Sequence, residues 1–345
     1  MASLVSADRL AVHVRRLSKC LVGISWLLGL LVAMAYWLPG YYLSEAAAFF
    51  APQFIFLSIA VALLACILSR SLGYTTPVLA ALWLTLGLGT YDQLRALTPP
   101  EPAGDPEKVF TLMSLNLERF EYDDTRLMAV INNTQPDLVL FQETGAATPR
   151  LQALLADTYT HAIVPPDGHD SDLTVFSKLP LSDVQQQRIQ SIPLSYGKLN
   201  AYIEFTVETA QTPIKVYAVH PTSPHIPSKL LARTTYLETI AAKVAQRTND
   251  PDNSVPVIVA GDWNTSPWSK SFPSLLEEMS LTTRFERGFP RNTRYFFAPE
   301  LADLAGSQVD HIAVSAPLSL SSVKVAADVG SDHLPLIANV DLPKR

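Results

Sequence analysis

The stretch Val257-Ile258-Val259-Ala260-Gly261-Asp262-Trp263-Asn264 decides how this chain folds. Its first four residues are all apolar, which is typical of a strand that is buried on both faces. The run stops at Gly261 and is followed by two polar side chains, Asp262 and Asn264. If the backbone stays extended there, the two side chains point the same way, because alternate residues of a strand share a face. The stretch therefore predicts a buried strand with a carboxylate and an amide at its tip.

Polar side chains close other predicted strands in the same way. Asn116 follows an apolar run over 109–115, and Glu143 ends the run that begins at Leu138. Further strands are predicted over 173–177, 201–207, 214–220, 256–260 and 311–315, and helices over 125–133, capped by Asp123 or Asp124, and 228–247. Strands and helices mix without strict alternation, which favours a layered α/β or α+β domain. Since packing alone does not explain so many polar strand ends, we expect them to build one site.

The first quarter of the chain is apolar enough to enter a membrane. Charged residues make up 17% of the sequence, whereas soluble proteins average about 25%. Asp, Glu, Lys and Arg are absent from three runs, 20–44, 46–69 and 71–91. Since about 20 apolar residues cross the hydrocarbon core, these runs predict three transmembrane helices near 20–39, 49–68 and 75–91. The alternative is a buried helical hairpin of a soluble protein.

Basic residues predict the orientation of these helices. They precede the first run, at Arg9, Arg15, Arg16 and Lys19. Arg70 separates the second run from the third, and only Glu45 lies between the first two. Because positive loops stay inside, we expect residues 1–19 in the cytoplasm and the chain after about residue 92 in the periplasm, as in a multi-pass inner-membrane protein. A cleaved signal peptide is the alternative, since Ala33-Met34-Ala35 resembles a cleavage site.

A proline-rich linker over 92–107 precedes a domain over 108–345. Four prolines stand within 98–106, a segment without apolar periodicity. From residue 105 onward the chain has 20 Lys+Arg and 28 Asp+Glu, a net charge of −8. Such acidity disfavours a protein that grips long nucleic acid by neutralising its phosphates. Both cysteines, Cys20 and Cys66, lie in the apolar runs, so the domain has neither a disulfide framework nor a thiolate metal site.

Six short motifs, in this order, resemble those of the endonuclease/exonuclease/phosphatase superfamily, the DNase I-like proteins. They are Ser114-Leu115-Asn116, Phe141-Gln142-Glu143, Val219-His220, Gly261-Asp262-Trp263-Asn264, Gln308-Val309-Asp310-His311-Ile312 and Gly330-Ser331-Asp332-His333-Leu334-Pro335. Each motif is weak alone, but the ordered set over about 108–341 is specific. The resemblance implies a four-layered αββα sandwich with its site at one end of the two sheets. The run His220-Pro221-Thr222-Ser223-Pro224, followed by Arg233 in the next helix, looks like the membrane-anchored bacterial branch.

The resemblance also implies a metal-dependent phosphoesterase. Glu143 would bind Mg²⁺ or Mn²⁺, hard cations that carboxylates and water coordinate in proteins. Asn116 would support the metal and contact the phosphate, and Asp332 would assist the metal. No set of His and Cys residues at zinc spacing competes with this interpretation.

The remaining motif residues are implied to react with or hold the substrate. Asp262 would orient or deprotonate the attacking water, and Asn264 would hold a phosphate oxygen. Asp310 would fix the tautomer of His333, which would stabilise the developing charge or transfer a proton. His220 would face the phosphate, and His311 would be structural. Whether His333 or Asp262 is the base stays open from the sequence.

Basic side chains beyond the motifs are further candidates for substrate binding. Arg233 either contacts a phosphate or headgroup or lies on a solvated helix face, and His225 is a weaker candidate. Four arginines form a basic cluster in the acidic domain, Arg284, Arg287, Arg291 and Arg294. They either receive a phosphate-bearing substrate, with Arg291 and Arg294 in contact, or form a solvated loop with local ion pairs.

Taken with the resemblance, the sequence predicts a membrane-anchored, Mg²⁺-dependent phosphoesterase whose site lies outside the cytoplasm. The anchor and the acidic domain favour a lipid-linked phosphate or a phospholipid as substrate, with the bilayer as partner. Nucleic acid and small soluble phosphoesters are the less expected substrates. Nucleic acid would make the protein an extracytoplasmic endonuclease or exonuclease. A non-catalytic membrane-anchored binding module is the alternative of another class, and the complete set of expected residues disfavours it.

Overall fold

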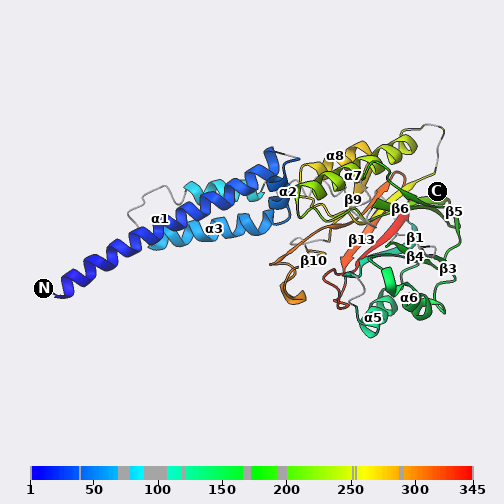
Figure 1. Ribbon diagram of the computed structural model, residues 1–345, viewed down its shortest axis with the longest axis horizontal. Coiled ribbons are helices and arrows are strands. Elements are labelled where there is room, and N and C mark those ends of the chain that lie inside the picture. The colour runs from blue at the N-terminus through cyan, green and yellow to red at the C-terminus, as the bar shows by residue number, and fades with distance from the viewer. Residues whose placement is uncertain are drawn as a thin grey trace. The chain divides into compact units, whose positions relative to one another are not determined.

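Two six-stranded sheets build the part of the chain that carries the motifs (Figure 1). The computed structural model describes residues 2–38, 40–68, 78–88, 107–118, 122–165, 172–192, 200–250, 252, 255–286 and 291–343. The chain divides into two units, Met1–Ala96 with Trp268–Lys270, and Leu97–Pro267 with Ser271–Arg345. The motifs all lie in the second unit, and each unit is described by itself below.

Both sheets of the second unit are mixed. The first has the order β13-β14-β1-β2-β4-β3 and the second β5-β6-β7-β8-β12-β9. In those orders, the strands of the first are Ser319–Val325, Leu336–Leu342, Glu107–Asn116, Leu138–Gln142, Thr174–Ser177 and His161–Ile163. Those of the second are Leu181–Arg188, Ala201–Glu208, Pro213–Val219, Val257–Asp262, Asp310–Ser315 and Leu281–Thr283. Strands β1 and β2 pair in parallel, as do β7 and β8, and this brings the carboxyl ends of each pair to one edge.

The two sheets share one apolar core. Leu112 and Leu140 of the first sheet belong to the same buried cluster as Val216 and Ile258 of the second. Every residue of β8 is buried, and alternate residues, Ile258 and Ala260, join this cluster. The strand is therefore covered on both faces, as its uninterrupted apolar sequence predicts.

Helices cover the outer faces of the two sheets. On one side, α5 (Asp124–Thr134) and α6 (Thr148–Leu155) pack Leu127, Ile131 and Leu151 into a second apolar cluster with Phe141 of β2. On the other, α7 (Pro227–Thr248) and α8 (Ser271–Glu278) lie together, and the Tyr236 hydroxyl of α7 donates to the Ala201 carbonyl of β6 (Figure 1). The four-layered αββα sandwich is thus confirmed. The short elements are η3 (Gly145–Ala147), η5 (Pro299–Leu301), and the paired β10 (Arg294–Tyr295) and β11 (Gly306–Ser307).

The N-terminal unit is helical. Its elements are α1 (Ala2–Trp37), α2 (Tyr42–Ala48), α3 (Ala51–Leu68) and a helix over Val78–Leu88. Of these, α1 and α3 are long and apolar enough to cross a membrane. The third predicted span, 75–91, is described only over 78–88, and the predicted linker lies outside the described residues up to Glu107, where β1 already begins.

The helices of this unit pack around Trp83. Its indole Nε1 donates to the Ser25 hydroxyl at 3.0 Å, and that hydroxyl donates to the Ser58 carbonyl at 2.9 Å. A Cβ added at Gly29 would lie 2.1 Å from the Trp83 ring, so only glycine leaves room for the indole. The outer faces stay apolar and exposed, with Leu27 60%, Phe56 69% and Ile67 78% exposed.

Candidate active site

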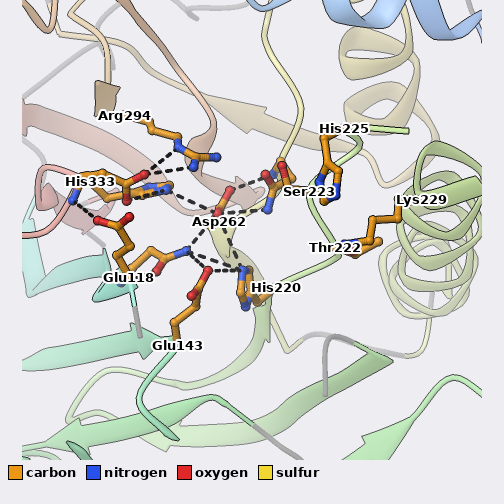
Figure 2. Close-up of a pocket in the computed structure, with 13 residues that line it drawn as sticks. Glu118, Glu143, His220, Thr222, Ser223, His225, Lys229, Asp262, Arg294 and His333 are labelled. Atoms are coloured by element: carbon orange, nitrogen blue, oxygen red, sulfur yellow. Dashed lines mark hydrogen bonds and ion pairs between the residues drawn. The ribbon is translucent and has the colours of Figure 1, made fainter. Parts of the chain in front are cut away.

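The polar side chains at the strand ends converge on one pocket of about 430 Å³ (Figure 2). Nine of the sequence-predicted residues line it: Asn116, Glu143, His220, His225, Asp262, Asn264, Arg294, Asp332 and His333. The other lining residues are Glu118, Thr222, Ser223 and Lys229. Predicted residues that lie behind or outside the pocket are Asp310, Arg233 and Arg291.

Asp262 and Asp310 lie directly opposite each other in the antiparallel pair β8–β12. Asp310 Oδ2 lies 2.9 Å from His333 Nδ1, so the expected Asp310–His333 contact is present. With Nδ1–H donating to this carboxylate, Nε2 of His333 faces Asp262 Oδ2 at 3.8 Å. Ligand atoms of these three buried residues lie within 4.8 Å of one another, close enough to hold a metal ion.

Asp262 is held by two asparagines. The backbone N–H of Asn264 donates to Asp262 Oδ1 at 2.8 Å, and its side-chain Nδ2 donates to Oδ2 at 3.0 Å. Asn116 Nδ2 donates to the same Oδ2 at 3.1 Å. Burial and the neighbouring Asp310 raise the pKa of Asp262, while His333 and His220 oppose this. Because Asn264 also gives Nδ2 to the Pro221 carbonyl, it positions Asp262 and leaves no free amide hydrogen for the predicted phosphate contact.

His220 has a partner that the sequence did not reveal, Asp172. Its Nδ1 lies 2.8 Å from Asp172 Oδ2, which directs Nε2 towards Asp262 Oδ2 at 3.7 Å and Glu143 Oε1 at 3.8 Å. Asp172 directly precedes a predicted strand, as Asp310 does, and this shared pattern was the available signal.

Both imidazoles are held in their charged form by carboxylates. Burial lowers the pKa of His220, but Asp172, Asp262 and Glu143 outweigh it and raise this pKa to about 10. For His333, burial is likewise outweighed, chiefly by Asp310, and the pKa rises to about 9. In the metal-free protein, each ring therefore presents an N–H to the pocket at neutral pH.

Glu143 and Asn116 meet below Asp262. Asn116 Nδ2 donates to Glu143 Oε1 at 3.2 Å, while its Oδ1 accepts the backbone N–H of Glu118 at 2.9 Å. The amide nitrogen of Asn116 thus faces the carboxylates. Its contacts with a metal and with the phosphate stay predictions. Asn116 orients Glu143 and Asp262, and the Glu143 side chain remains 27% exposed to the pocket.

Asp332 forms an ion pair with Arg294. Arg294 Nε and Nη2 lie 3.0 and 2.9 Å from Asp332 Oδ2. His333 Nε2 is farther away, 3.7 Å from Asp332 Oδ1. The backbone N–H of Asp332 donates to Glu118 Oε2 at 3.1 Å. Glu118, which the sequence analysis did not single out, is thus a further carboxylate of the pocket; it stands two residues after Asn116.

The other predicted arginines do not line the pocket. Arg233 is neither on a solvated helix face nor among the lining residues, because it is buried and donates Nη1 to the Asn264 carbonyl at 3.0 Å. Arg291 is half-buried, with Nε 3.7 Å from Asp303 Oδ2. Arg284 is buried and interacts electrostatically with Asp341. Arg287 is outside the described residues. Of the predicted arginine cluster, Arg294 alone among the described residues reaches the pocket.

His311 packs away from the pocket in an aromatic group. Its ring lies 4.4 Å from that of Phe272 and 5.6 Å from that of Trp263, and Nε2 donates to the Thr265 carbonyl at 2.8 Å. Burial lowers the pKa of His311 to about 4. The ring is therefore neutral at neutral pH, which fits a packing residue.

The carboxylate oxygens of the pocket fit a divalent cation. Carboxylates of Glu118, Glu143, Asp262 and Asp332 line it, while the only Lys and Arg among the described lining residues are Lys229 and Arg294. Mg²⁺ prefers oxygen ligands and is held in proteins by one or two carboxylates together with water. Glu143 is the best placed of these carboxylates, since its side chain is 27% exposed to the pocket, whereas Arg294 donates to Asp332 Oδ2.

Comparisons with known proteins agree with this fold. An endonuclease/exonuclease/phosphatase from Beutenbergia cavernae DSM 12333 is 20% identical, with 69% of this chain and 72% of that chain covered at a TM-score of 0.56. A beta toxin mutant from Staphylococcus aureus with bound magnesium ions is 16% identical, with 67% and 99% covered at 0.53. A family protein from Bacteroides thetaiotaomicron is 13% identical, with 70% and 100% covered at 0.52. No curated protein matches the chain.

At these identities the solved structures show the fold alone. The model of the Endonuclease/Exonuclease/phosphatase family, however, matches residues 113–333, more than half of the chain. This span holds every motif residue from Asn116 to His333. The chain therefore belongs to the endonuclease/exonuclease/phosphatase family.

Proposed function

We propose that the protein is a membrane-anchored, Mg²⁺-dependent phosphoesterase that acts on a lipid-linked phosphate ester. The observation that carries the chemistry is the position of Asp262 Oδ2, which lies 3.7 and 3.8 Å from the Nε2 atoms of His220 and His333. A proton acceptor thus lies between two N–H donors. This is the arrangement that attack of water on a phosphorus atom requires.

Each of these residues has a task in that reaction. Asp262, fixed by Asn264 and Asn116, accepts the proton of the attacking water. The Nε2–H groups of His220 and His333 donate to the phosphate oxygens as negative charge develops there. Glu143, with Asp332 nearby, would hold Mg²⁺, which would supply further positive charge for those oxygens. Arg294 holds Asp332 in place through its two bonds to Oδ2.

Membrane anchoring is supported by the surfaces of α1 and α3. A soluble hairpin would bury its large apolar side chains, yet Leu27, Phe56 and Ile67 are mainly exposed. Cleavage beside Ala35 would remove Ser25 and Gly29, which accommodate Trp83. Retention of α1 is therefore favoured over its removal as a signal peptide, with residues 1–19 in the cytoplasm and the site in the periplasm.

The anchor favours a lipid substrate. The 18 residues between Leu88 and Glu107 span at most about 70 Å, so the catalytic unit stays close to the bilayer. Enzyme and lipid then share one surface, which raises their effective concentration. A nuclease gains nothing comparable, and the net charge of −8 after residue 104 repels a polyanion.

A comparison of substrates tests this proposal. Full-length protein in mixed micelles should release phosphate or headgroup from polyprenyl phosphates or phospholipids, and EDTA should abolish the release. Plasmid DNA under the same Mg²⁺ and salt should be cleaved weakly. Efficient nicking of the plasmid without hydrolysis of any lipid would overturn the lipid assignment and favour the extracytoplasmic nuclease.

A further inference from the structure

The pocket continues beyond the catalytic groups to the start of α7. Figure 2 shows Glu118 and Glu143 on one side of Asp262, and His225 and Lys229 on the other. At the first end the lining residues include carboxylates, whereas at the second the titratable side chains, His225 and Lys229, are basic. The catalytic proposal uses the first end and leaves the second without a task.

The second end holds unused hydrogen-bond donors. The Thr222 side chain is 2% exposed, and its buried Oγ1 has no hydrogen-bond partner among the described residues. A buried hydroxyl without a partner costs free energy unless a ligand bonds to it. Thr222 lines the pocket, as does Lys229, whose ammonium group can donate three hydrogen bonds.

The N-terminus of α7 adds to this positive end. The helix has 22 residues, begins at Pro227, and has Ile226 at its N-cap, where no side chain caps the first turn. The free N–H groups of a first helical turn favour an anion, and Lys229 lies in that turn. His225, just before the helix, also lines the pocket and is exposed.

We propose that Thr222, His225 and Lys229 form a second anion subsite, which binds a phosphate adjacent to the one attacked. The assignment rests on the proposed phosphoesterase function and makes its substrate a lipid-linked diphosphate. A quaternary ammonium headgroup fits poorly, because it is bound by the rings of Trp, Tyr or Phe and none of these is among the described lining residues.

The reaction on such a substrate balances without another reactant. The oxygen of water bonds to the phosphorus beside Asp262, and the bond from that phosphorus to the bridging oxygen breaks. The bridging oxygen leaves with the electron pair as part of the second phosphate, whose added negative charge lies beside Lys229. The proton of the water passes to Asp262.

Paired substrates test the subsite. Full-length protein in detergent micelles is given farnesyl diphosphate or farnesyl monophosphate at one Mg²⁺ concentration. Lys229→Gln and Thr222→Val should each lower the ratio of kcat/KM for diphosphate over monophosphate, Lys229→Gln by about 10-fold, as for a lost charge-assisted hydrogen bond. Lys243→Gln is the matched control, since Lys243 lies on the same helix over the Tyr202 ring and should leave the ratio unchanged. An unchanged ratio in both pocket variants would overturn the subsite.

A binding measurement separates this inference from the proposed function. Methylenediphosphonate, which is not hydrolysed, should bind the wild-type protein more tightly than inorganic phosphate does, and Lys229→Gln should remove that advantage. If no substrate is hydrolysed but the advantage and its loss are observed, the phosphoesterase proposal fails and the subsite stands. Equal affinities for the two ligands in the wild-type protein would overturn the subsite. The subsite would also be overturned if Lys229→Gln weakened the binding of a dinucleotide but not that of methylenediphosphonate.

Discussion

At the scale of single residues, the site depends on two unusual backbone positions. Glu143 and Asn264 have φ of 56° and 48°, in the left-handed region that few side chains other than glycine and asparagine adopt. Such strain is retained where the surroundings hold it, and it is common at functional sites. Here Arg233 binds the Asn264 carbonyl and Asn116 binds the Glu143 carboxylate, so both side chains are fixed facing the pocket.

Glu143→Gln should abolish the response to Mg²⁺. The change keeps the shape of the side chain but removes the anionic oxygen that a hard cation needs. We expect turnover to fall by about 10²-fold or more, the scale of a lost electrostatic contribution, in assays over a range of Mg²⁺ concentrations. Glu238→Gln, on α7 outside the pocket, is the control. A wild-type Mg²⁺ titration in the Glu143 variant would show that the metal lies elsewhere, with Asp262, Asp310 and His333 as the next set to test.

Asp310 and His333 should act as one unit. His333→Ala and Asp310→Ala should each lower kcat by about 10²-fold, because the first removes an N–H donor and the second the carboxylate that orients it. Since both changes break the same 2.9 Å contact, the double variant should lose little more than either single one. If the fold losses in kcat of the two single variants multiply in the double variant, Asp310 and His333 act independently.

Asp172 should act through His220 in the same way. Asp172→Asn removes the charge beside Nδ1 of His220 and leaves the amide in its place, so the ring loses its orientation and its raised pKa. We expect kcat to fall by about 10-fold or more, with no further loss when His220→Gln is added. Full activity of Asp172→Asn would leave the 2.8 Å contact without a catalytic role.

At the scale of elements, the sequence predicts best the strands that are buried on both faces. Continuous apolar runs with polar tips identified β1, β2, β7, β8 and β12, and the Asp123 cap of α5 is confirmed by its bond from the Arg126 N–H. Strand β5 was missed because Leu181–Arg188 is half exposed and has no apolar alternation. Arg233 was misplaced, although it stands three residues after Leu230 and four before Leu237, on the face that α7 buries.

The site was predicted less completely than the strands that carry it. A motif identifies which residue stands at a strand end, but not which atom of an amide faces the pocket, as Asn116 and Asn264 show. Nor does sequence spacing give contacts between distant segments. The pairs Asp172–His220 and Arg294–Asp332 bridge 48 and 38 residues and exist only once the sheets have formed.

Gly261 should be essential to the β7–β8 edge. Its φ is 144°, and a Cβ added there would lie 2.0 Å from the Val219 carbonyl oxygen. Gly261→Ala should therefore destabilise the catalytic unit by roughly 2–4 kcal/mol through overpacking and strain, measured from the urea midpoint of the full-length protein in detergent. Gly23→Ala is the control, because a Cβ there meets nothing within 4 Å. Equal midpoints for the two variants would contradict this explanation.

At the scale of the whole molecule, we expect the apolar helices to determine where the chemistry takes place. We predict that the positive residues before α1 keep the N-terminus in the cytoplasm, and three spans would then place residue 103 in the periplasm. Alkaline phosphatase fused after Ala103 should be active, and green fluorescent protein at the same point should be dark. The reverse result would put the site in the cytoplasm.

The mature protein should keep its first helix. Removal of the residues up to Ala35 would take away the Ser25 hydroxyl and the space at Gly29 that Trp83 occupies. The mass of the purified protein, expressed with a C-terminal tag, should therefore include residues 2–35. A mass that corresponds to a chain starting at residue 36 would identify α1 as a signal peptide.

Because Asp310 pairs with Asp262 across β8 and β12, catalytic turnover depends on the register of these two strands. Because side chains alternate along a strand, a slip of one residue between these strands would turn one carboxylate to the opposite face. Such a molecule would keep its secondary structure, and circular dichroism would count it as native, yet it would not turn over substrate. Turnover per molecule after refolding would therefore report the fraction of chains whose central strands have joined in the right register.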